Sequence, residues 1–129
     1  MTIELTMLAL SIVLGFVHIM VVVRAVTRQY GSKWNMGARD EILPPMEPLP
    51  GRLTRARDNF LETFPFFAAA VLIAHVAERN GLLTLIGVQL YFWGRVVYLP
   101  LYALGIPRIR TLVWTIATLG IGLVMASLV

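Results

Sequence analysis

Charged and amide side chains occur inside strongly apolar segments of this chain. Arg55, Asn59 and Glu62 have the spacing i, i+4 and i+7, which places them on one face of a helix. Arg95 stands in the middle of a later apolar segment, with tyrosines three and seven residues further on. A charge inside a membrane span is costly, so it is usually paired or functional. These residues therefore predict a polar site inside a membrane protein.

The predicted site has the chemistry to bind a small zwitterion with several carboxylates. Guanidinium groups bind carboxylates through two parallel hydrogen bonds, and Arg110 and Arg24 add guanidiniums to that of Arg55 near the site's mouth. An amide, phenols and the carboxylate of Glu62 lie deeper and are suited to the polar remainder of the ligand. The sequence has no cysteine, which excludes a disulfide framework, and no metal, flavin or nucleotide motif is present.

Four apolar segments must position these groups. Hydrophobic residues make up 58% of the 129 residues and charged residues 14%, whereas a soluble domain has about 25% charged residues. A membrane helix needs roughly 20 apolar residues, and short connections favour antiparallel neighbours. We predict one all-α, integral membrane domain over residues 1–129, an up-down four-helix bundle. Its helices are expected at about residues 3–27, 52–78, 82–106 and 108–128.

The basic residues indicate the orientation in the membrane. All but two of the 11 lysines and arginines lie at or near one face, the exceptions being Arg79 and Arg95. The positive-inside rule places the loop over residues 28–51 and the connection before the last helix in the cytoplasm. The net charge of +4 is then a topology signal. Membrane lipid is an expected partner, and nucleic acid is not.

Depths counted along the predicted helices bring the polar residues together. Glu62 and Arg95 each lie about ten residues, roughly 15 Å, from the same face, which predicts a buried ion pair. His18, alone on the first helix, is expected to be an interior or interface residue. Three polar stripes then converge on a cavity open to the cytoplasm. Its shallower levels are formed by Asn59, Tyr98 and Trp114, then by Arg55, Tyr102 and Arg110.

These residues resemble the MAPEG superfamily, the membrane-associated proteins in eicosanoid and glutathione metabolism. The family's Arg-Ala-x-x-Asn-x-x-Glu pattern, followed closely by proline, corresponds to residues 55–62 and Pro65. Its third-helix and fourth-helix patterns correspond to residues 94–96 and 108–111. The resemblance implies a homotrimer that binds glutathione between neighbouring subunits. The chain is most similar to the bacterial MAPEG-like branch, which implies the bacterial inner membrane.

The resemblance also implies a role for each matched residue. Arg110 and Thr111 take the catalytic positions beside the glutathione thiol and would stabilise its thiolate. The implied function is a glutathione-dependent transferase or peroxidase acting on small, hydrophobic electrophiles. The positions that match glutathione-binding residues are Arg24, Arg55, Asn59, Glu62, Arg95, Tyr98, Tyr102 and Trp114.

Departures from the family pattern support an alternative function. Asp58 stands where some members carry a basic residue, Trp114 stands where they have tyrosine, and Pro65 comes one residue early. The alternative is a non-catalytic membrane protein that keeps the scaffold as a structural or accessory subunit. In that case Glu62 and Arg95 form a structural ion pair, Arg110 is a topology anchor, and the aromatic residues form an interfacial belt.

Overall fold

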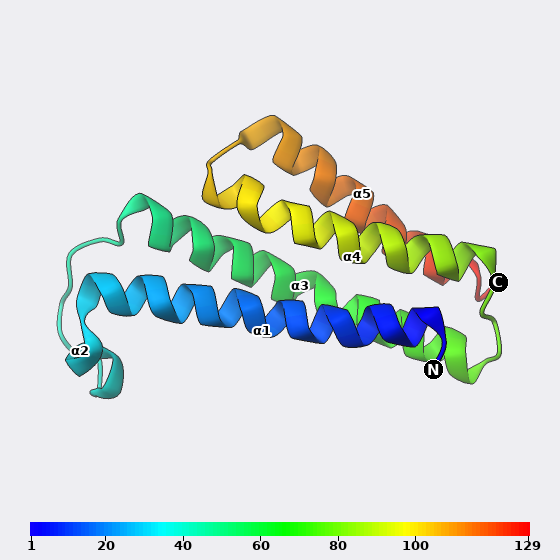
Figure 1. Ribbon diagram of the computed structural model, residues 1–129, viewed down its shortest axis with the longest axis horizontal. Helices are drawn as coiled ribbons and strands as arrows, with labels where there is room; N and C mark the ends of the chain where they lie inside the picture. The colour runs from blue at the N-terminus through cyan, green and yellow to red at the C-terminus, as the bar shows by residue number, and fades with distance from the viewer.

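The fold is all-helical, as the sequence predicts. The computed structural model describes all 129 residues, and its helices run side by side (Figure 1). All except the short α2 are long and apolar enough to cross a membrane, so the prediction of an all-α membrane bundle is confirmed. The helices are α1 (Ile3–Tyr30), α2 (Ser32–Met36), α3 (Pro48–Val76), α4 (Leu82–Ala103) and α5 (Pro107–Ala126).

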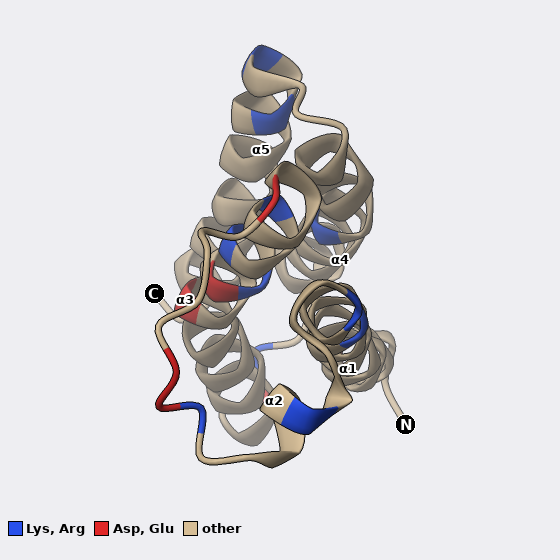
Figure 2. Ribbon diagram, turned by 90° about the vertical axis from the view of Figure 1, so that its left-hand side faces the viewer, with Lys and Arg blue, Asp and Glu red and all other residues tan.

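The two ends of the bundle carry different parts of the chain. Both termini and the turn over residues 77–81 lie at one end, here called the terminus end (Figure 1). The connections over residues 31–47 and 104–106 lie at the other, here called the loop end. Figure 2 looks onto the loop end and shows basic residues near the ends of α1, α3 and α5. The charge asymmetry read from the sequence is therefore an asymmetry of the fold.

Local signals explain where the helices begin and end. Thr2 caps α1 by accepting a hydrogen bond from the backbone N–H of Leu5 at 3.3 Å. α1 runs three residues beyond its predicted end and stops at Gly31, whose φ of 94° favours glycine. α3 begins at Pro48, earlier than predicted, because proline suits the first helical turn. Pro107 starts α5 in the same way.

The connection over residues 31–47 is more ordered than the sequence predicts. It contains α2. Side chains at the end of α1 hold its last residues in place by hydrogen bonds. The Tyr30 hydroxyl donates to the Pro44 carbonyl at 2.7 Å, and the Gln29 side chain donates to the Pro45 carbonyl at 3.1 Å. The Gln29 side chain also accepts from the backbone N–H of Glu47 at 2.9 Å. The chain therefore enters α3 at a fixed place.

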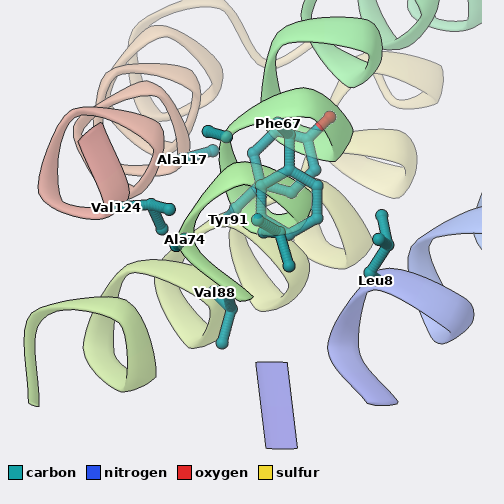
Figure 3. Close-up of a cluster of buried hydrophobic side chains, with 9 residues drawn as sticks. Leu8, Phe67, Ala74, Val88, Tyr91, Ala117 and Val124 are labelled. Atoms are coloured by element: carbon teal, nitrogen blue, oxygen red, sulfur yellow. The ribbon is translucent and has the colours of Figure 1, made fainter. Parts of the chain in front are cut away.

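The apolar core fills the terminus half of the bundle (Figure 3). The rings of Phe67 and Tyr91 stack there at a centroid distance of 3.9 Å. α4 and α5 meet backbone to backbone at Gly87 and Gly120. A Cβ added to either glycine would lie 2.6 or 2.5 Å from the other's carbonyl oxygen. Small residues permit such close approach between membrane helices. The core residues are Leu8, Phe67, Ala70, Val71, Ala74, Val88, Tyr91, Ala117 and Val124.

Candidate functional site

A cavity of about 430 Å³ lies between α3, α4 and α5 in the loop half of the bundle. Its size falls within the range typical of small-molecule sites. Of the residues that line it, all except Asp58 belong to the site predicted from the sequence. The depths counted along the helices placed these side chains together, and in the structure they line one cavity. The lining residues are Arg55, Asp58, Asn59, Glu62, Tyr98, Tyr102 and Arg110.

Tyr102 holds two arginines at the cavity. The guanidinium carbon of Arg110 lies 4.4 Å from the centroid of its ring, and that of Arg55 lies 5.8 Å away. Arg55 Nε also donates a hydrogen bond to the Tyr102 hydroxyl at 3.2 Å. The one salt bridge in the structure joins Arg57 to Asp58. Arg55 and Arg110 are therefore not within ion-pair distance of any carboxylate. Both guanidiniums can therefore bind an anionic ligand without first breaking an ion pair.

Asp58 forms an ion pair with its neighbour in the sequence. Arg57 donates to Asp58 Oδ1 from Nε at 3.0 Å and from Nη2 at 2.8 Å. Both side chains are partly exposed, at 29% and 55%. The acidic group that departs from the family pattern is thus partly offset within the same turn of α3. The sequence contained this signal as an adjacent Arg-Asp pair.

Arg95 is buried as predicted, but its partner is different. Arg95 Nη1 donates to Asn59 Oδ1 at 2.9 Å, and the predicted ion pair with Glu62 is absent. Equal depth does not fix the direction of a side chain around its helix. Glu62 comes three residues after Asn59, so it points about 60° away from it around α3. Asn59 therefore faces α4, while Glu62 is exposed and lines the cavity.

Aromatic rings replace the missing carboxylate around Arg95. Its guanidinium carbon lies 4.6 Å from the ring centroid of Tyr98 and 5.4 Å from that of Phe60. A desolvated cation–π contact is worth about 2 kcal/mol. The sequence analysis did not single out Phe60. Its position directly after Asn59, in a turn of the helix that faces the bundle interior, was a signal that could have identified it. It is 1% exposed and packs between α1, α3 and α4.

Several predicted site residues do not line this cavity. Arg95 is buried behind its wall, and Trp114 is half-buried elsewhere on α5. Thr111 is exposed, and its hydroxyl donates to the Pro107 carbonyl at 3.1 Å. Arg24 lies on α1 and lines a separate cavity of about 640 Å³ between α1 and the start of α3. Arg24 and Thr111 are therefore separate from this cavity. His18 is fully buried, in agreement with the expectation that it is an interior residue.

Comparison with known proteins identifies a family over nearly the whole chain. The family model described as MAPEG matches residues 7–129. No curated protein and no solved structure matches the chain. The matched range includes most of α1, the whole of the other three spanning helices and every residue that lines the cavity.

Proposed function

Since this chain belongs to the MAPEG family, we propose that it is a membrane-bound, glutathione-dependent transferase or peroxidase. Its second substrate is a small, lipophilic electrophile. One observation carries the proposal: the cavity presents Arg55 and Arg110 without a carboxylate partner. A site that keeps two free cations and one free carboxylate, that of Glu62, is matched to a small zwitterion.

The cavity's groups complement those of glutathione. Arg55 would bind one of its carboxylates, because a guanidinium pairs with a carboxylate in bidentate geometry, and Arg110 would then be left for its thiol. Glu62 would accept hydrogen bonds from its ammonium group. Asn59 and Tyr98 offer hydrogen-bonding groups for its peptide amides. The Arg57–Asp58 pair supports the proposal further, since Asp58 then repels the ligand carboxylates less than a free aspartate would.

Arg110 and Thr111 are the proposed catalytic residues. Bound glutathione would supply the thiol. After the thiol loses its proton, its sulfur would bond to the electrophilic atom as that atom's bond to its leaving group breaks, and the leaving group would depart with the electron pair. A neighbouring cation favours the thiolate form of a thiol. Arg110 lines the cavity, and its guanidinium is the one closer to the centre of the Tyr102 ring. Thr111 would assist as a hydrogen-bond donor after its hydroxyl turns away from the Pro107 carbonyl.

The proposal includes a homotrimer with its sites between subunits. Arg24 lies outside its own subunit's cavity, so its proposed contact with glutathione is to the site of a neighbouring subunit. Trp114 is half-buried, with its indole N–H unpartnered, and is proposed to complete the same site. We propose further that the membrane is a bacterial inner membrane and that the loop end, which carries most of the basic residues, faces the cytoplasm.

Calorimetry on purified protein in detergent tests the proposal. Glutathione at millimolar concentration should give saturable binding, and Arg55→Ala or Arg110→Ala should weaken it at least tenfold. Arg108→Ala is the matched control, because Arg108 is exposed near the start of α5 and does not line the cavity. Turnover of a chloronitrobenzene should be lost in Arg110→Ala. An absence of glutathione binding to the unmodified protein would refute the proposal.

A non-catalytic accessory subunit is the second candidate. The observation in its favour is that the Thr111 hydroxyl is engaged by its own helix and lies outside the cavity. This candidate predicts no turnover of lipophilic electrophiles, whether or not glutathione binds. Turnover that disappears in Arg110→Ala would exclude it.

A further inference from the structure

Unpartnered polar atoms are concentrated at one place in the bundle interior. Four of the six buried side-chain nitrogens and oxygens without a hydrogen-bond partner belong to two residues. They are Nδ1 and Nε2 of His18 on α1, and Nε and Nη2 of Arg95 on α4. Their side chains are 0% and 1% exposed. Neither bulk water nor the lipid can reach these atoms.

The two residues lie against the same aromatic ring. His18 stacks on Phe60 with 4.8 Å between ring centroids, and the guanidinium carbon of Arg95 lies 5.4 Å from the Phe60 centroid. Gly15 makes room for this ring, since a Cβ there would lie 3.1 Å from Phe60. α1 and α4 therefore each place unpartnered nitrogens beside the same ring of α3.

Buried polar groups in native proteins are almost always satisfied, and an unpartnered group needs an explanation. His18 and Arg95 make no direct hydrogen bond with each other. A neutral imidazole offers one donor and one acceptor, and a guanidinium offers donors only. A water molecule accepts from the guanidinium and donates to the imidazole, and buried waters typically have about three such partners.

We propose that an internal water site, bounded by His18, Phe60 and Arg95, lies between α1, α3 and α4. Through this water, His18 is a positioning residue for Arg95. The water site stands on the unpartnered atoms alone. Only its consequence for glutathione binding rests on the proposed function.

The water site reaches the cavity through Asn59. Arg95 Nη1 donates to Asn59 Oδ1, and Asn59 lines the cavity. Arg95 already uses one lone pair of this oxygen, whereas the NH₂ group makes no hydrogen bond within the protein, so the NH₂ donor is the freer group that Asn59 offers to a ligand. His18, the water, Arg95 and Asn59 thus form a chain that fixes this donor in the cavity wall. The chain selects ligands with a carbonyl or carboxylate acceptor at that position.

Thermal unfolding in detergent tests the water site without any ligand. His18→Phe keeps a flat ring on Phe60 but removes both nitrogens, so the melting temperature should fall by roughly 4 °C or more. His18→Gln keeps a donor and an acceptor and should recover most of that loss. The double variant His18→Phe/Arg95→Met should melt no lower than Arg95→Met alone, because the partners of the water are then both absent. Fully additive losses would overturn the water site.

Two further measurements decide its chemistry and its consequence. The melting temperature should be equal in sodium chloride and sodium gluconate, and a chloride-dependent rise would overturn water in favour of a bound anion. Glutathione affinity should weaken about three- to tenfold in His18→Phe and recover in His18→Gln. An unchanged affinity in His18→Phe would refute the positioning role. If no variant and no unmodified protein binds glutathione while the stability pattern holds, the proposed function fails and the water site stands.

Discussion

α4 and α5 touch backbone to backbone at the terminus end, whereas at the loop end side chains stand between them. Gly87 and Gly120 form the contact in the first region. In the second, the guanidinium of Arg110 on α5 lies over the ring of Tyr102 on α4. The same pair of helices is therefore joined by close packing in one half and by a cation–π contact in the other.

The difference separates stability from binding along the length of one bundle. In the terminus half, apolar side chains fill the interior and little can move without overlap. In the loop half, Tyr102 holds the two free cations of the site, Arg55 and Arg110, and no carboxylate neutralises them. A ligand carboxylate can compete for such cations, because it replaces weaker contacts. We expect variants of the first half to change unfolding, and variants of the second to change binding, with an added loss of stability where they remove a partner of the buried Arg95.

The largest expected effect is on close packing. Gly87→Leu would place side-chain atoms where Gly120 and Val124 already lie, since even a Cβ would come within 2.8 Å of both. Overpacking of this kind costs about 3 kcal/mol of unfolding free energy. Gly122→Leu is the matched control, because nothing lies within 4 Å of a Cβ at Gly122. Thermal unfolding in detergent should show a large loss only for Gly87→Leu, and equal melting temperatures would contradict the packing account.

The second expected effect lies at the buried cation of the loop half. Asn59→Leu removes the one side chain that accepts a hydrogen bond from Arg95. The unfolding free energy should fall by about 1.5–3 kcal/mol, which is the contribution of a hydrogen bond to a charged group. Asn59→Asp has nearly the same shape and offers Arg95 a carboxylate, so its unfolding free energy should stay close to that of the unmodified protein. Glutathione affinity should fall in both variants, because both lack the amide donor. An Asn59→Asp protein as unstable as Asn59→Leu would rule out this view of Arg95.

Helix periodicity predicted all of the spanning helices and all the residues that line the cavity except Asp58. Rise per residue is nearly constant in an α-helix, so depth could be counted for Arg55, Tyr102 and Arg110. Direction around the helix could not be counted, because it depends on which neighbour each face meets. That is why the sequence analysis paired Arg95 with Glu62, whereas in the structure Arg95 is hydrogen-bonded to Asn59. Arg24 shows the same limit, since its depth suits the site but its helix lies on the other side of α3.

The short helix α2 could not be predicted, for a related reason. Five residues between two glycines are too few to form a helix through intrinsic propensity. α2 is instead supported by aromatic contacts made after folding. Trp34 lies against Tyr30 at 5.0 Å between ring centroids, and the guanidinium of Arg39 lies 5.0 Å from the Trp34 ring. These contacts join residues of α1, of α2 and of the connection after it. The spacing of hydrophobic residues in the sequence does not indicate such contacts.

A smaller effect is expected where Tyr102 meets Arg55. Tyr102→Phe keeps the ring beneath both guanidiniums and removes the hydroxyl that accepts from Arg55 Nε. The loss of one hydrogen bond, worth about 1 kcal/mol, should weaken glutathione binding several-fold by calorimetry. Tyr30→Phe is the control, since it removes a hydroxyl bonded to the Pro44 carbonyl, away from the cavity. Equal affinities in the two variants would show that Arg55 does not depend on Tyr102 for its position.

The smallest expected effect comes from Asp58→Asn, which removes a charge from the cavity and hardly changes its packing. Asp58 lines the cavity, and its pair with Arg57 is partly exposed, so the pair contributes at most about 1 kcal/mol to stability. Asp58→Asn should leave the melting temperature nearly unchanged.

The same substitution removes a negative charge from beside the proposed carboxylate site and releases the guanidinium of Arg57. Glutathione should therefore bind about two- to threefold more tightly at low salt, and the gain should shrink as added salt screens exposed charges. Asp40→Asn is the control, because Asp40 is exposed on the connection before α3 and does not line the cavity. Weaker binding in Asp58→Asn would mean that Asp58 accepts hydrogen bonds from the ligand, and the loop half would then hold two acidic contacts instead of one.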